Sequence, residues 1–250
     1  MRTGIPRELH PDQVGLDRHG LSDPPTERAT DRVGAAMRTG IIGTGRIGST
    51  LARILVAAGH EVLLANARGP RSIGPLLAEL GPTASAAHPA EVADQAELLV
   101  LMVPYASIRG LLPPAAVQDK VLVDATNAFG GAGAPADLGD RSSSELVAEW
   151  YPGARVVKSL NTMHFETLAV AGGTSRTKSR GSTAGGERLA HFTAGDDEKA
   201  KEIVAGIITD LGFAPVDTGS LHSGGILQQP GGPLFNRPLT EAQALAWISH

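Results

Sequence analysis

The stretch IIGTGRIGSTLARILVAAGHEVLLANARGP, residues 41–70, decides the fold. It begins with an apolar strand, turns at glycines spaced as GxGxxG, continues as an amphipathic helix and returns in a second apolar strand. Gly43 permits a sharp turn, Gly45 lacks a Cβ and admits a ligand to the backbone, and Gly48 allows close helix–strand packing. The stretch therefore predicts a strand–helix–strand unit that receives a dinucleotide pyrophosphate at the N-terminus of its helix.

The same alternation continues along the chain. Apolar runs separated by helices predict a doubly wound parallel sheet, that is, an NAD(P)-binding Rossmann fold of the α/β class, with a small C-terminal α/β extension. The expected strands are 39–42, 61–65, 82–85, 97–103, 120–124, 155–158, 189–195 and 213–219. The expected helices are 46–58, 72–80, 90–95, 105–112, 143–149, 196–212 and 239–248.

Composition divides the chain into three parts. Residues 1–36 mix prolines with charges of both signs and predict a disordered extension. Residues 37–162 carry the Rossmann pattern, and residues 163–250 form a smaller part expected to cover an acceptor site, with a flexible Gly/Ser/Thr/Arg-rich loop at 171–188. The motif MRTGI occurs at Met1 and again at Met37, either by chance or because translation can start at the second methionine.

Overall charge and residue usage exclude several classes of function. The net charge of -4 argues against a dedicated nucleic-acid binder, and the absence of cysteine excludes disulfides, thiolate catalysis and Cys-ligated zinc. The histidines show no metal-ligand spacing, and prolines and an arginine interrupt the most apolar run. We expect a cytoplasmic protein without metal that does not bind a membrane, and the apolar ALAWI segment near the C-terminus suggests a homodimer.

The end of the second strand indicates which dinucleotide binds. An Asp or Glu is common there in NAD-binding chains, because its carboxylate accepts from the ribose 2′-hydroxyl. This chain has Asn66-Ala67-Arg68 instead, followed by Arg71. A guanidinium matches a phosphate with its planar set of donors, so Arg68 and Arg71 favour NADP(H), with Asn66 binding the ribose or adenine. The alternative is that both arginines are solvated surface residues.

Several further motifs, in this order, resemble those of the NADPH-dependent F420 reductases and the wider NADP oxidoreductase group that includes cytosolic domains of some metalloreductases. The motifs are GIIGTGRIGSTLA, NARGP, VPY, VVKSLNT, AGDDEKAKEIV and GFAPVDTGSL. The resemblance covers about residues 37–250 and implies hydride transfer between NADPH and the deazaflavin coenzyme F420. Such a hydride transfer needs no assigned catalytic side chain, because the two cofactors carry the reactivity.

The resemblance also implies which residues bind the cofactors. The pyrophosphate would lie against Thr44, Gly45, Arg46 and Ile47, and the 2′-phosphate against Ala67, Arg68 and Arg71. The ribose and nicotinamide would lie against Val103, Pro104, Tyr105, Asn127, Asn161 and Thr162. The F420 ring would be covered by His222 and the ILQQPGGPLF segment, residues 226–235.

Three of these assignments have plain structural alternatives. Tyr105 could stack on the nicotinamide or cap a strand-to-helix turn. Lys158 could be catalytic, although a strand lysine more often reaches a phosphate or a carboxylate. His222 could polarise the acceptor or have no role. Two other functions also remain open: NADPH-dependent reduction of another acceptor (an imine, ketone, flavin or metal chelate), and NADPH sensing without catalysis.

Overall fold

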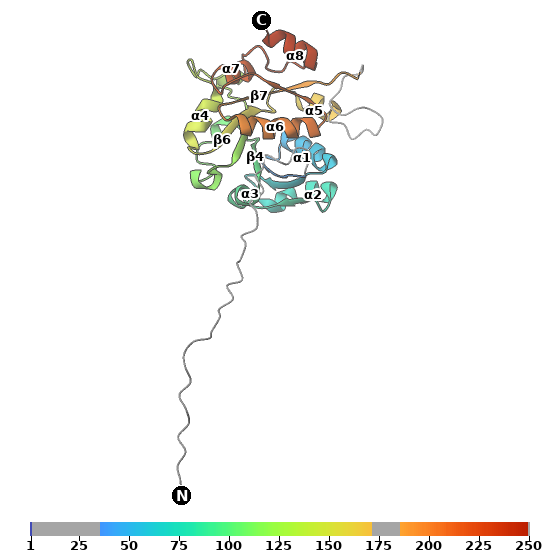
Figure 1. The fold of residues 1–250 in the computed structure, drawn as a ribbon, viewed down its shortest axis with the longest axis vertical. Helices are drawn as coiled ribbons and strands as arrows, with labels where there is room; N and C mark the ends of the chain where they lie inside the picture. Colours follow the sequence, from blue (N-terminus) through green and yellow to red (C-terminus); the bar gives the residue numbers. More distant parts are fainter. Residues whose placement is uncertain (2–35, 172–185, 250) are drawn as a thin grey trace.

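A computed structural model describes Met1, residues 36–171 and residues 186–249. The predicted N-terminal extension and the predicted flexible loop at 171–188 therefore lie outside the described residues, except for the few residues at their ends. The described part forms a sheet with helices on both faces, shown in Figure 1.

Eight strands of the described residues form one sheet in the order β3-β2-β1-β4-β5-β6-β7-β8. Neighbouring strands from β3 to β6 are parallel, which confirms the predicted doubly wound fold. The strands are β1 (Arg38–Ile42), β2 (Glu61–Ala65), β3 (Ala84–Ala86), β4 (Leu98–Leu101), β5 (Val121–Asp124), β6 (Arg155–Ser159), β7 (Ala190–Gly195) and β8 (Ala214–Asp217).

The last two strands belong to the predicted C-terminal extension, for which the sequence predicted no strand direction. β7 pairs with β6 in the antiparallel direction, with Ser159 opposite Thr193, and β8 is parallel to β7. The C-terminal strands thus extend the same sheet in the opposite direction. This reversal brings the amino end of β7 beside the carboxyl end of β6, where ligands bind in parallel sheets.

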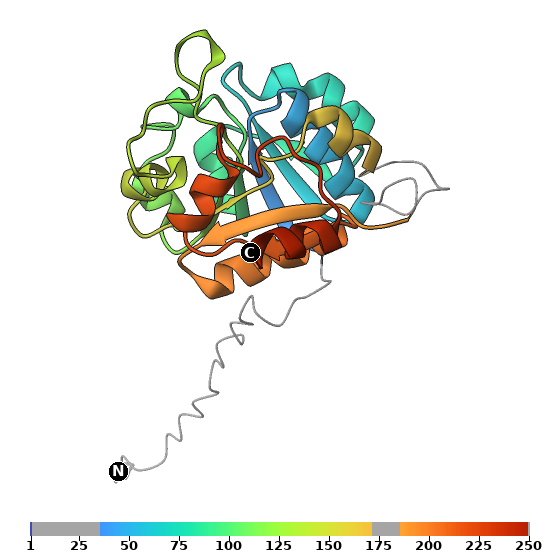
Figure 2. The same cartoon turned by 90° about the horizontal axis from the view of Figure 1, so that it is seen from above.

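The helices cover the two faces of the sheet in separate groups. One face carries α1 (Arg46–Ala58), α2 (Gly74–Leu80), α5 (Phe165–Ala171) and α6 (Glu198–Asp210). The other carries α3 (Pro89–Gln95), α4 (Ser143–Trp150), α7 (Ser223–Gln228) and α8 (Glu241–Ile248). In Figure 2, α1 and α5 lie to the right of the strands and α4 and α7 to the left.

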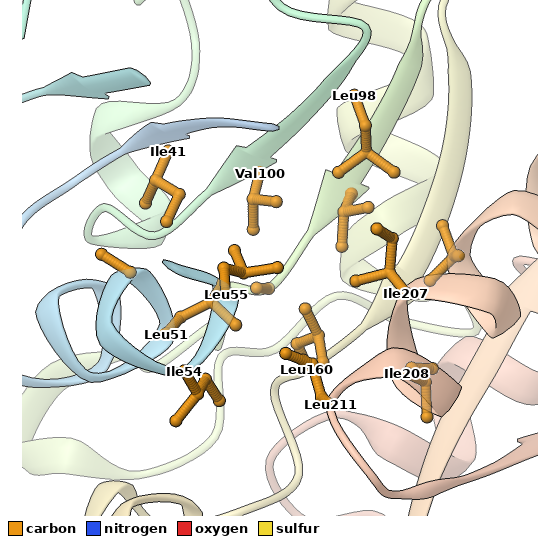
Figure 3. Packing of buried hydrophobic residues seen from close by; sticks show 14 of the residues in the cluster. Ile41, Leu51, Ile54, Leu55, Leu98, Val100, Leu160, Ile207, Ile208 and Leu211 are labelled. Atoms are coloured by element: carbon orange, nitrogen blue, oxygen red, sulfur yellow. The ribbon is translucent and has the colours of Figure 1, made fainter. Parts of the chain in front are cut away.

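The largest hydrophobic cluster lies between α1, α6 and the sheet. Leu51 and Leu55 of α1 and Ile207 of α6 belong to this cluster, together with strand residues such as Ile41 and Val100, as Figure 3 shows. These helix residues repeat at i, i+4 spacing, so each helix presents one apolar face to the strands. The helix α1 ends at Gly59, whose φ of 97° is the left-handed conformation common after a helix.

One predicted helix is absent from the described structure, and one observed helix was not predicted. The expected helix at 105–112 is only a 3-10 turn, η3 (Tyr105–Ser107), followed by irregular turns, because Gly110 has a φ of 78° and prolines follow at 113 and 114. The helix α7 was not predicted: its sequence SGGILQ contains two glycines and is short. Among the helices described here, none is long and apolar enough to cross a membrane.

Candidate functional site

The glycine turn after β1 has the geometry that its spacing predicts. Gly43 has a φ of 118°, and its N–H donates to the Ala65 carbonyl at 2.8 Å. A Cβ on Gly43 would overlap the Met102 carbonyl, and a Cβ on Gly48 would overlap the Gly43 carbonyl. Any side chain at these two positions would push β1, β4 and α1 apart, so both glycines are required by packing.

Gly45 is different, because a Cβ there would meet no protein atom within 4 Å. Its backbone, at φ -72° and ψ -168°, is allowed for any residue, so neither packing nor conformation explains the glycine. Gly45 is also the N-cap of α1, where no side chain accepts from the helix amides and no acidic residue stands in the first turn. A bare, uncapped helix N-terminus fits the pyrophosphate of a dinucleotide.

Beside this helix end, Asn66 organises the turn that follows β2. Its amide nitrogen donates to the Thr44 hydroxyl at 2.8 Å, which joins the two turns. Its amide oxygen accepts from the Arg68 N–H at 2.9 Å and from the Ser72 hydroxyl at 3.1 Å. Asn66 therefore stabilises the turn through both ends of its side-chain amide, in addition to its predicted role in binding the ribose or adenine.

The two arginines of this turn are available to a ligand. Arg68 and Arg71 are both exposed, and in the described part of the chain neither forms an ion pair. Ala67 between Asn66 and Arg68 is exposed as well and offers only its backbone. Ser72, which sequence reasoning missed, places a hydroxyl in the same turn.

The remaining residues of the phosphate turn point in two directions. The Arg46 guanidinium lies 5.3 Å from the ring centroid of Phe165, the first residue of α5, so α5 packs beside the start of α1. Ile47 packs against the main core, and only its backbone amide can serve a phosphate. In the first turn of α1, Arg46 is the cationic side chain that could contact a phosphate.

The segment after β4 brings Val103 and Pro104 to the edge of the site, but Tyr105 turns away from it. Its ring packs against Trp150 at 5.5 Å, and its hydroxyl donates to the Ser143 carbonyl at 3.4 Å. Burial, together with the negative charge of Asp124, raises the pKa of Tyr105 to about 12. The phenol is neutral at physiological pH, and its packing against α4 favours the structural role.

Asn127 and Asn161, which follow β5 and β6, are joined to each other. The Asn127 amide donates to the Asn161 carbonyl at 3.2 Å, and the Asn161 amide donates to Asn127 Oδ1 at 3.1 Å and to the Gln228 carbonyl at 2.8 Å. Asn161 and its neighbour Thr162 are buried. The predicted nicotinamide-side residues from two strands are thus brought together and tied to the end of α7.

Two acceptors in this amide network have no hydrogen-bond partner among the residues that the structure describes. Asn161 Oδ1 and Gln228 Oε1 are buried without a hydrogen bond, while the Gln228 amide nitrogen donates to the Thr218 hydroxyl at 2.9 Å. A buried unpaired acceptor costs about 1–3 kcal/mol, so it is unfavourable unless a ligand or water donates to it. The carboxamide of a nicotinamide carries the N–H groups that such oxygens need, so these two acceptors fit NADP(H).

A buried ion pair supports the loop that carries Asn127. The Lys158 ammonium lies 3.2 Å from Asp124 Oδ2 and donates to the Thr126 carbonyl at 2.6 Å, and both charged side chains have no exposed surface. Asp124 also accepts from the Thr126 N–H, the Thr126 hydroxyl and the Ser144 hydroxyl.

Burial opposes the charge of Asp124, but Lys158 and the hydroxyl and N–H donors outweigh it and hold the pKa of Asp124 below its usual value. Asp124 is therefore an anion matched by Lys158. The lysine reaches a carboxylate, as a strand lysine usually does, and acts as a support. Sequence reasoning missed Asp124 and Ser144, and it included Gln228 only as part of the segment 226–235 expected to cover the acceptor. The only signal for Asp124 is a carboxylate that ends a wholly apolar strand.

His222 stands at the N-cap of α7. Its Nδ1 lies 3.1 Å from the Glu145 carboxylate, which also accepts from the Ser142 N–H at 2.7 Å as part of the capping box of α4. A Cβ on Gly225 would lie 2.8 Å from the Ser142 Cβ, so α7 needs its glycines to approach α4. His222 is more than half exposed, so it borders the site without being enclosed in it.

These features define an NAD(P)-binding Rossmann oxidoreductase, and comparisons with known proteins specify the family. The family model described as NADP oxidoreductase, coenzyme F420-dependent, matches residues 38–128. The solved structure of a hypothetical protein from Sinorhizobium meliloti is 37% identical, covers 83% of this chain and 97% of its own, and superposes with a TM-score of 0.72.

Two further relatives agree. A protein from Arthrobacter sp., named for an inferred F420-dependent NADP-reductase activity, is 29% identical with a TM-score of 0.63, covering 74% of this chain and 86% of its own. The rat metalloreductase STEAP3 is 29% identical over 194 residues, which are 75% of this chain but only 35% of that protein. The chain thus spans about a third of the curated relative that it matches. It belongs to the family of coenzyme F420-dependent NADP oxidoreductases and is an NADP-dependent oxidoreductase.

Proposed function

We propose that this enzyme transfers a hydride between NADPH and a deazaflavin coenzyme of the F420 type. The observation that carries the NADPH half is the bare N-terminus of α1 at Gly45, beside a turn that presents Arg68 and Arg71, neither of which has an ion-pair partner among the described residues. The family model and the Arthrobacter relative support the deazaflavin half.

Within this proposal the residues have distinct binding roles. The amides of Thr44 to Ile47 and the Arg46 side chain would hold the pyrophosphate, and Arg68 and Arg71 the 2′-phosphate. The Asn127–Asn161 pair, together with Val103, Pro104 and Thr162, would hold the nicotinamide and its ribose. His222 would contact the acceptor.

Bound NADPH would supply the hydride, so the protein's task is to align two rings and exclude water. The site has the rigidity for this task. Asn161 is bonded to two segments, the β5 loop and the end of α7, while Asp124 and Lys158 fix Thr126 beside Asn127. Neither Tyr105, which is neutral and faces α4, nor the paired Lys158 is placed to act as a general acid.

The decisive experiment mixes the purified protein with NADPH and oxidised F420 and follows the loss of deazaflavin absorbance. Parallel reactions replace NADPH by NADH, and F420 by a flavin, a ferric chelate, a cyclic imine or a small ketone. Turnover with NADPH and F420, and much less with NADH, is the expected result.

Each other outcome assigns a different function. Turnover on the ferric chelate alone would point to metal reduction, the activity named for the rat relative. Tight NADPH binding without turnover on any acceptor would point to a sensing module. Failure to bind NADPH, measured by fluorescence titration, would reject the proposal altogether.

A further inference from the structure

Two phenylalanines from distant parts of the sequence pack against each other. Phe129, in the loop after β5, and Phe235, in the segment after α7, pack edge to face with ring centroids 6.0 Å apart and planes at 72°. Phe129 remains 49% exposed, one of few large apolar side chains in the described ranges that is open to water. Phe235 is partly buried, so its contact with Phe129 leaves one ring of the pair open to water, and an exposed phenylalanine held in place in this way needs an explanation other than core packing.

The two segments that carry these rings are folded, and they touch. In the first, Gly130 N–H donates to the Ala134 carbonyl at 2.7 Å and Ala136 N–H to the Ala128 carbonyl at 3.0 Å. In the second, Leu234 N–H donates to the Leu227 carbonyl at 3.0 Å. A Cβ on Gly231 would lie only 3.3 Å from the Pro135 Cγ, so the segments are in close contact beside the ring pair.

The ring pair is connected to the nicotinamide side of the site through the amide network. Phe129 follows Asn127 by two residues, and the segment of Phe235 begins at Gln228, whose carbonyl accepts from Asn161. The Asn127–Asn161 pair thus anchors both segments at their starts. A flat molecule that lies on the nicotinamide would extend toward Phe129 and Phe235.

We propose that Phe129 and Phe235 form the apolar surface that receives the acceptor ring, and that they select planar aromatic acceptors over small carbonyls, imines and inorganic ions. The inference rests on the proposed function and names the residues that choose its acceptor. A deazaflavin ring laid against Phe129 would cover apolar surface that water now contacts, and aromatic rings attract one another in offset or edge-to-face arrangements. A compact acceptor gains nothing from this surface.

The test uses Phe129→Ala and Phe235→Ala, with Phe129→Tyr as a conservative variant and Leu245→Ala as a matched loss of an exposed apolar side chain on α8. Binding of oxidised F420 and of riboflavin is titrated by fluorescence in the presence of NADP⁺. KM is measured with F420 and with ferricyanide, and the NADPH Kd is measured separately.

We expect each alanine variant to raise the Kd and KM for the planar rings by about tenfold, which corresponds to about 1.4 kcal/mol. The NADPH Kd and the ferricyanide rate should change less than twofold, Phe129→Tyr should bind as the wild type does, and Leu245→Ala should change nothing. Unchanged ring binding in both alanine variants, or equal losses for ring and ferricyanide, would overturn the inference.

The outcomes also separate this inference from the proposed function. Should wild-type protein bind riboflavin through Phe129 but not reduce F420, the ring surface stands and the deazaflavin function fails. Reduction of F420 that is insensitive to both substitutions keeps the function and rejects the ring surface. A wild-type protein that binds neither ring rejects the inference directly.

Discussion

Asn127 and Asn161 hydrogen bond to each other in both directions across the carboxyl ends of β5 and β6, side-chain amide to carbonyl at 3.2 Å and side-chain amide to side-chain oxygen at 3.1 Å. A third bond, from Asn161 to the Gln228 carbonyl, fixes the end of α7 against the same pair. This network lies where the proposed nicotinamide site and the acceptor-side segments meet. The hydrogen bonds that stabilise this part of the fold therefore also fix the positions of the site residues.

The substitution Asn161→Asp tests this network with almost no change of shape. It replaces a buried donor by an acceptor that faces two other oxygens, Asn127 Oδ1 and the Gln228 carbonyl. Each buried group left unpaired costs about 1–3 kcal/mol, so we expect urea unfolding to show a loss of that size or more. Asn236→Asp, at an exposed site, should change stability by less than about 0.5 kcal/mol. Equal effects of the two substitutions would mean that the network contributes nothing.

Gly45→Ala separates ligand binding from folding. The added methyl group enters open space at an allowed backbone conformation, so the melting temperature should not fall. The same methyl group would occupy the approach of the pyrophosphate, and we expect NADPH affinity to fall by about tenfold or more, at least about 1.4 kcal/mol. Gly74→Ala adds a methyl group in equally open space at the first residue of α2 and should leave NADPH binding unchanged. Retained affinity in Gly45→Ala would place the phosphates elsewhere.

Arg68→Ala tests the choice between NADP(H) and NAD(H). Hydrogen bonds to charged groups contribute about 1.5–3 kcal/mol, so NADPH binding should weaken roughly ten- to a hundredfold while NADH binding stays nearly constant. Arg38→Ala, which removes an exposed arginine paired with Glu61 at the amino end of β1, is the matched control. Isothermal titration with both dinucleotides distinguishes the outcomes, and equal losses for NADPH and NADH would show that Arg68 only supports the turn.

Removing one member of the buried ion pair should be strongly destabilising. Lys158→Met leaves Asp124 without its counter-charge in a site with no exposed surface, and such losses reach about 3–5 kcal/mol. The double variant Lys158→Met/Asp124→Asn removes the uncompensated charge and should recover part of that loss. Chemical denaturation of the three proteins measures the effect. A single variant as stable as the wild type would show that Asp124 is neutral in the folded protein.

His191 predicts how stability depends on pH. The side chain lies fully buried on β7 with both ring nitrogens unpaired, its ring edge to face with Phe213, and burial lowers its pKa to about 4. Since an unfolded histidine takes up a proton near pH 6.5 and the folded one does not until about pH 4, acid favours the unfolded chain. The free energy of unfolding is therefore unaffected by His191 above pH 6.5. As the pH falls from 6.5 toward 4, His191 lowers this free energy by about 3 kcal/mol in all.

His191→Leu should remove that part of the pH dependence. The comparison of urea unfolding at pH 7 and pH 4.5 for the two proteins isolates the His191 contribution, because His60, whose pKa is also lowered by burial, is present in both. A variant that loses as much stability as the wild type over this pH interval would show that the pKa of His191 is not lowered in the folded protein.

The sequence predicted those parts of the fold that depend on local patterns. The strand at 61–65 and the helix at 46–58 were placed at their observed ends, since a continuous apolar run and a terminal glycine act over short distances. The roles of Gly43 and Gly48 could also be predicted, because the close turn between β1 and α1 leaves no space for a side chain at either position.

The other features depend on contacts between distant segments. The reversed direction of β7 is set by its pairing with β6, and nothing in LAHFTAG distinguishes a parallel from an antiparallel strand. The expected helix at 105–112 was wrong for a local reason, Gly110 and the prolines that follow it, and a distant residue adds to it, because the Tyr151 hydroxyl donates to the Ile108 carbonyl at 2.6 Å and holds this segment as turns. The Asn161–Gln228 contact spans 67 residues of sequence, which no local pattern can register.

The continuation of one sheet from β3 to β8 has a mechanical consequence. Many two-domain dehydrogenases can bring their reactants together by swinging one lobe against the other about a flexible joint. Here the segments on the nicotinamide side and those beside Phe235 follow strands of the same hydrogen-bonded sheet. Within the described residues, no hinge separates the two sides of the proposed site. We therefore expect ligand entry to require only small local adjustments, and ligand-free crystals should remain intact when soaked with the dinucleotide.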